Sequence, residues 1–100
     1  MMGEIADILD KAADLIEPEG AWSGFVCDGP NCAATAIDDV AQTYRASRPA
    51  LVYFAKFLGS SNILGGIWKW NDAPERTQAE VVAKLREAAS KARGEQRSTA

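Results

Sequence analysis

Side chains able to bind another molecule are densest around two tryptophans in the second half of the chain. Trp68 and Trp70 lie just before Asn71 and Asp72, and the third tryptophan is Trp22. Tryptophan often carries binding energy at protein interfaces, and Asn and Asp supply hydrogen-bonding groups that can orient a small ligand. Two sites are therefore considered: a protein-binding anchor at Trp68 and Trp70, and a ligand or catalytic pocket at Trp22, Trp70, Asn71 and Asp72. The simpler interpretation, favoured for at least one tryptophan, is that its ring fills the core while Asn71 and Asp72 bond to a turn backbone.

Two stripes of charge offer a second kind of candidate surface. An acidic stripe at helical spacing, made of Asp7, Asp10, Asp14 and Glu17, occupies the first predicted helix. Arg86, Arg93 and Arg97 form a basic line near the end of the chain. Such stripes can dock a partner of opposite charge, which makes Arg86 and Arg93 candidate binding residues. The simpler interpretation is that these are the solvated faces of amphipathic helices.

The chain has no histidine, and this count excludes much chemistry. Ser-His-Asp and Cys-His nucleophiles, His-ligated zinc and imidazole proton transfer all need that side chain. The two cysteines, Cys27 and Cys32, are too few for a four-ligand zinc site, and their spacing is not C-x-x-C. We favour Cys32 as a small buried side chain at a helix start, and whether the two cysteines pair stays open. We predict no catalytic residue, no metal site and no cofactor, so an enzyme is not favoured.

The net charge and the hydropathy limit which classes of partner and which cellular compartment we expect. A net charge of −3 argues against a nucleic-acid binder. The apolar runs are far shorter than the roughly 20 residues of a membrane span. The N-terminus resembles no signal peptide, so we expect a cytoplasmic protein.

Apolar residues recur with a helical period in four stretches. They predict helices over about 4–17, 32–44, 49–58 and 78–93. Pro49 is expected in the first turn of the third helix, a Thr77/Glu80 capping box at the start of the last, and Gly94 as its stop. A short extended piece is expected near 22–27. The segment 59–74 is predicted to be loop-rich, a geometry in which Trp68 and Trp70 can share a face.

These elements predict an all-α fold. We expect a single-domain bundle of four helices over residues 1–94, with the tryptophan-containing loop before the last helix. Residues 95–100 lack apolar side chains and are predicted to be a frayed tail.

Three short segments together resemble a known family. They read Leu15-Ile16-x-Pro18-x-Gly20-x-Trp22, Cys32-Ala-Ala-Thr-Ala-Ile37 and Trp70-Asn71-Asp72-x-Pro74-x-Arg76-Thr77-x-x-Glu80. The sequence resembles an uncharacterised family of small proteins from bacteria and their phages, a domain of unknown function. The Trp-Asn-Asp…Thr-x-x-Glu segment is its most specific part. The resemblance implies a phage or prophage setting and implies no activity.

We therefore predict a non-enzymatic protein-binding or accessory module of unknown partner. The alternative is a small-ligand-binding protein or enzyme with the pocket at Trp22, Trp70, Asn71 and Asp72. A third interpretation is a homo-oligomer formed through the third helix, whose core stripe is widened by Val52, Tyr53 and Phe57.

Overall fold

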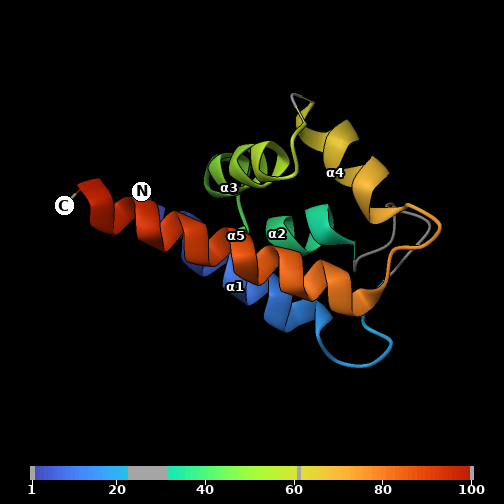
Figure 1. Cartoon of the computed structure of the whole chain (residues 1–100). Coiled ribbons are helices and arrows are strands. Elements are labelled where there is room, and N and C mark those ends of the chain that lie inside the picture. Colours follow the sequence, from blue (N-terminus) through green and yellow to red (C-terminus); the bar gives the residue numbers. More distant parts are fainter. Residues whose placement is uncertain (1, 23–31, 61, 100) are drawn as a thin grey trace.

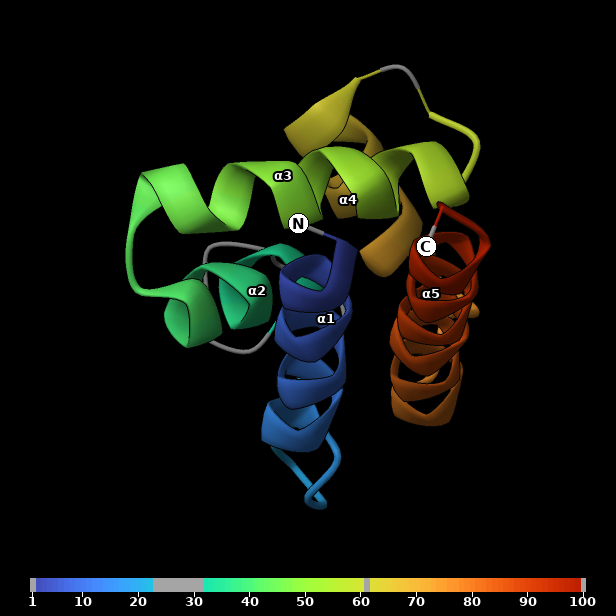
Figure 2. The same cartoon turned by 90° about the vertical axis from the view of Figure 1, so that its left-hand side faces the viewer.

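Five α-helices make up most of the computed structural model, which describes residues 2–22, 32–60 and 62–99. They are α1 (Met2–Ile16), α2 (Ala33–Ala41), α3 (Tyr44–Phe57), α4 (Ile63–Asn71) and α5 (Gln78–Thr99). α1 and α5 run antiparallel side by side, and α2, α3 and α4 lie along one flank of this pair (Figure 1). α3 crosses near the N-terminal end of α1 and the C-terminal end of α5 (Figure 2). None of these helices is long and apolar enough to cross a membrane.

Small side chains let α1 and α5 approach closely. The fully buried residues of the two helices include Ala12 and Ala13 on α1 and Ala88, Ala89 and Ala92 on α5. Larger side chains such as Leu9, Ile16 and Leu85 fill the remaining space at 0% exposure. α1 and α5 consequently share the most extensive helix–helix contact of the described chain.

The predicted all-α, single-domain class is confirmed, because the described residues contain helices and no strand. The predicted count of four helices is wrong, since α4 occupies part of the segment expected to be a loop. Asn62 starts α4 by accepting a hydrogen bond from the Gly65 N–H at 2.9 Å. A Cβ atom on Gly65 would lie 2.8 Å from the Asn62 side chain, so glycine makes room for this cap. Residues that suggest a turn are therefore the start of a helix.

The boundary between the second and third helices also differs from the prediction. α2 ends at Ala41 because Gln42 adopts a left-handed conformation with φ of 69°. Thr43 then caps α3 by accepting from the Ala46 N–H at 3.1 Å. α3 consequently begins at Tyr44, and Pro49 lies inside the helix rather than in its first turn.

The last helix begins as predicted and ends later than predicted. Thr77 Oγ1 accepts from the Glu80 N–H at 3.2 Å, and Glu80 Oε1 accepts from the Thr77 N–H at 3.1 Å, which confirms the capping box. Gly94 does not stop the helix. An ion pair of 3.5 Å between Lys91 and Glu95 spans it, and α5 continues to Thr99. The extended piece expected near 22–27 lies outside the described residues beyond Trp22.

Candidate functional site

Asn71 is the centre of a buried polar cluster that joins three distant parts of the chain. Its side chain is 0% exposed. Asn71 Oδ1 accepts from Trp22 Nε1 at 2.8 Å and from the Ala33 N–H at 3.1 Å, and Asn71 Nδ2 donates to Asp72 Oδ1 at 3.0 Å. Since the first N–H groups of a helix have no partner within it, Asn71 satisfies one donor at the start of α2.

Arg76 connects this cluster to α5. Its guanidinium lies 4.2 Å from the Trp70 ring centroid, and its Nε donates to the Trp70 carbonyl at 2.9 Å. Arg76 also pairs with Glu80 at 3.1 Å. The pKa of Glu80 is lowered, first by the hydrogen bond from the Thr77 hydroxyl and then by the Thr77 backbone and Arg76. We call Trp22, Ala33, Trp70, Asn71, Asp72 and Arg76 the Asn71 cluster.

Four residues of the predicted pocket are thus adjacent, as the pocket hypothesis requires. Their polar groups, however, are directed at one another and at the backbone. These hydrogen bonds use both polar atoms of the Asn71 amide, and the Trp22 indole N–H is bound as well. Such an arrangement holds helix ends together, because Asn71 binds the Trp22 indole and the first N–H of α2 rather than the turn backbone of the simpler interpretation. Arg76, which the sequence reasoning did not select, completes the cluster.

Trp68 and Trp70 lie on different sides of α4 and in different surroundings. Both tryptophans are on α4, so the expected loop geometry is wrong and residues two apart point to different sides. Trp70 packs edge-on against Phe54, with ring centroids 5.9 Å apart. Trp68 is 43% exposed, so it stays available as a predicted contact residue.

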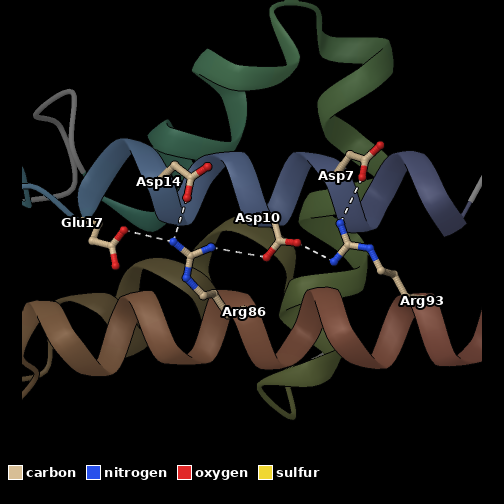
Figure 3. A network of polar contacts seen from close by, with 6 residues as sticks. All are labelled: Asp7, Asp10, Asp14, Glu17, Arg86 and Arg93. Atoms are coloured by element: carbon tan, nitrogen blue, oxygen red, sulfur yellow. Dashed lines mark hydrogen bonds and ion pairs between the residues drawn. The ribbon is translucent and has the colours of Figure 1, made fainter.

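Arg86 and Arg93 face the acidic stripe of α1 (Figure 3). Arg86 Nη2 lies 2.7 Å from Asp14 and 3.1 Å from Glu17, and Arg93 Nη2 lies 3.1 Å from Asp7. Asp10 pairs with both arginines. The pKa of each arginine is raised, chiefly by its hydrogen bond to Asp14 or to Asp10. Arg86 and Arg93 of the predicted basic line therefore bind the acidic stripe within this chain, and the side chain of Arg97 lies outside the described part of the structure.

Because Asp10 is shared by both arginines, its removal should weaken the whole network. We expect Asp10→Asn to lower the free energy of unfolding by about 1 kcal/mol in low salt, at the upper end for exposed pairs. Asp14→Asn, which removes the same charge but a single arginine contact, should cost less than half as much. Urea denaturation at low and high salt measures both values. Equal losses for the two variants would contradict a network centred on Asp10.

The cysteine prediction falls partly outside the described residues. Cys32 is fully buried at the N-cap of α2, which confirms the expectation of a small buried side chain at a helix start, and it is disulfide-bonded. Cys27 lies among the residues that are not described. Within the described residues, no group of three or more Cys, Asp or Glu side chains could hold a metal ion.

An open groove runs along the outer face of α3. Its apolar lining comes from Ile5 of α1 and from Tyr44, Pro49, Val52 and Tyr53 of α3, and its volume is about 650 Å³. Arg45, Arg48 and Lys56 complete the lining. We call these eight residues the α3 groove.

The outer face of α3 builds this groove because its residues recur with a helical period. Residues 45, 48, 49, 52, 53 and 56 follow one stripe of a 3.6-residue helix, whereas Ala50, Leu51 and Phe54 point into the core. The sequence reasoning noted Val52 and Tyr53 as widening the apolar face but missed the three cations that flank them on α3. The helical spacing of Arg45, Arg48 and Lys56 was the sequence signal that could have placed these cations on one face of α3.

Two features of the α3 groove bear on what it can bind. Arg48 Nη1 donates to the Tyr44 hydroxyl at 2.8 Å, which holds the 70% exposed Tyr44 ring in place. The Tyr53 hydroxyl oxygen is buried and has no partner in normal hydrogen-bond geometry within the described chain. Burial raises the pKa of Tyr53, and the neighbouring Glu95 carboxylate raises it further.

Together these observations define a small all-helical protein with a structural polar cluster and an open apolar groove flanked by cations. The family model described as a family of unknown function (DUF6197) matches residues 2–91, and the chain belongs to this family. No match was found among curated proteins or among solved structures.

Proposed function

We propose that this chain is a non-enzymatic protein-binding module and that the α3 groove is its binding surface. The observation that carries the proposal is the groove itself: an apolar floor beside three cations that have no ion pair within the described chain. Exposed apolar surface of this kind, rimmed by charge, is typical of interaction sites. The occupant we commit to is a segment of another protein that carries acidic and apolar side chains.

The hydrogen-bonding state of the polar side chains at the two candidate sites supports this choice over a small-ligand pocket. In the Asn71 cluster they are bound within the protein, whereas the Arg45 and Lys56 side chains of the α3 groove form no hydrogen bond or ion pair with the described residues. The cytoplasmic location and the phage or prophage setting stay predictions. Disulfides are uncommon in the cytoplasm, so the state of Cys32 in cells bears on the first of them.

Site-specific photo-crosslinking in a lysate of the source organism tests the proposal. The photoreactive p-benzoylphenylalanine is placed at Tyr44 in the groove, at Trp68 on α4 and at Glu87 on α5. We expect a discrete adduct with another protein from position 44 and none from position 87. The captured protein, once identified and purified, should bind the unmodified chain, and Arg48→Glu should weaken that binding about tenfold.

Other adduct patterns would count against the α3 groove. Adducts from position 68 alone would place binding at the exposed tryptophan instead. Adducts between two copies of the chain would favour the predicted homo-oligomer.

A further inference from the structure

The shape and charge of the α3 groove also indicate the kind of segment it takes, an inference that rests on the function proposed above. We propose that the α3 groove binds an acidic amphipathic helix of a partner protein. The apolar stripe of that helix lies against Pro49, Val52 and Tyr53. Its carboxylates face the cations of α3.

The groove has the length for a helix. α3 contains 14 residues, so its outer face runs for about 21 Å. Neighbouring hollows continue the groove at both ends. One shares Ile5, Arg45 and Pro49 with it, and the other shares Tyr53 and Lys56. An amphipathic helix that lays its apolar face in such a groove uses anchors at i, i+3 or i+4 and i+7, over two turns.

The charge of the groove selects an acidic occupant. α3 carries Arg45, Arg48 and Lys56 and no acidic residue. No ion pair reaches these three cations from the rest of the described chain. Acids do occur at the two ends of the continuous surface: Glu4 lines one hollow, and Glu95 lines the other while pairing with Lys91 at 3.5 Å. The centre of the groove is therefore the basic part, and opposite charge across an interface increases both on-rate and specificity.

A second copy of this chain is a poorer occupant. Its acidic stripe lies on α1 and directly after it, but Asp7, Asp10, Asp14 and Glu17 are bound by Arg86 and Arg93. Asp38 and Asp39 of α2 are exposed, yet they are adjacent in sequence and cannot form a stripe along a helix. The acidic helix is therefore expected from a different protein.

An anionic membrane surface shares the same charge but not the same shape. A side chain that enters a bilayer must protrude, whereas Pro49, Val52 and Tyr53 are half-buried on the lining of a hollow. The exposed groups around them are the cations and Tyr44. A convex helix can contact the lining of this groove, whereas a flat lipid surface can contact only the exposed residues at its edge.

Binding of designed peptides to the purified chain tests the inference. The probe is a fluorescein-labelled helical peptide of about 18 residues with leucines at i, i+3, i+4 and i+7 and glutamates beside them. One control replaces every glutamate with lysine, and another scrambles the order. We expect fluorescence anisotropy to give a Kd for the acidic probe at least ~10-fold lower than for either control, rising several-fold in high salt.

Variants of the chain locate the binding. Arg48→Glu should raise the Kd of the acidic probe about tenfold. Lys69→Glu, the same charge change at an exposed position of α4, should change it less than about twofold. Tyr44→Ala should weaken binding more than Trp68→Ala. Circular dichroism and thermal melting confirm that each variant is folded.

Each of the other outcomes overturns the inference in a distinguishable way. Equal binding of the lysine probe would show that charge does not select the occupant. Binding to anionic phosphatidylserine vesicles but not to the peptide would assign the surface to membranes. Loss of affinity in Lys69→Glu and Arg48→Glu alike would show that binding lies outside the groove. If no peptide binds while crosslinking from position 44 still captures a protein, the acidic-helix inference fails and the proposed function stands.

Discussion

Asn71→Ala is expected to lower the free energy of unfolding by about 2–4 kcal/mol, although it removes a single amide side chain. The amide oxygen accepts two hydrogen bonds from groups 49 and 38 residues away, the Trp22 indole and the Ala33 backbone. Truncation leaves both donors without that acceptor, and an unsatisfied buried donor costs about 1–3 kcal/mol. The Trp22 indole is only part-buried, which limits its share.

A matched control separates these bonds from the general effect of changing a polar residue. Asp72→Asn keeps an oxygen for the bond from Asn71 Nδ2 and should change stability by less than about 1 kcal/mol. Urea denaturation gives both values, and the Trp22 indole resonance in NMR reports whether that N–H has lost its partner. A wild-type urea midpoint for Asn71→Ala would show that the cluster does not hold the three segments together.

The Asn71 cluster also shows where sequence reasoning stops. One residue or more from each segment of the family resemblance meets here: Trp22, Ala33, Asn71 and Asp72. Their types and local order are visible in the sequence, but their contacts depend on how α1, α2 and α4 pack. A tryptophan beside Asn and Asp is consistent with a pocket or with a structural bond. The hydrogen-bond partners of the Asn71 amide, which the sequence does not show, distinguish the pocket from the structural bond.

Local signals were sufficient where the interaction itself is local. The apolar period of α1 and the Thr77/Glu80 capping box involve residues within one or a few turns, and both were predicted. α4 was missed because its start depends on Asn62 folding over Gly65 in a stretch whose composition suggests a turn. Gly94 misled for the opposite reason, since a helix held on both sides can continue through a glycine at a cost of about 1 kcal/mol.

The charged stripes illustrate an intermediate case. Both the acidic stripe and the arginines were recognised from their spacing, but their pairing was not. Asp14 and Arg86 are 72 residues apart, and only the antiparallel packing of α1 on α5 brings them to 2.7 Å. The three cations of α3 were overlooked because their helix was expected to begin at Pro49, which left Arg45 and Arg48 outside it.

Phe54→Ala should be the most damaging single change, lowering the free energy of unfolding by about 3–5 kcal/mol. Phe54 is at 0% exposure on the core face of α3 and packs edge-on against Trp70 of α4. Its truncation removes buried apolar surface and leaves a cavity that neighbouring helices cannot fully close. For a chain of this size the loss corresponds to a fall in Tm of roughly 15 °C or more.

Phe57 provides the matched control, since it lies on the same helix and loses the same atoms. Its ring is only half-buried, beside the ammonium groups of Lys84 and Lys91 at 5.7 and 5.9 Å. Phe57→Ala should therefore cost less than half as much as Phe54→Ala in the same urea titration. Because the core face of α3 fixes the direction of its outer face, Phe54→Ala should also weaken peptide binding where the fold persists. Equal destabilisation by the two variants would mean that Phe54 does not anchor α3, and that the groove is held by other contacts.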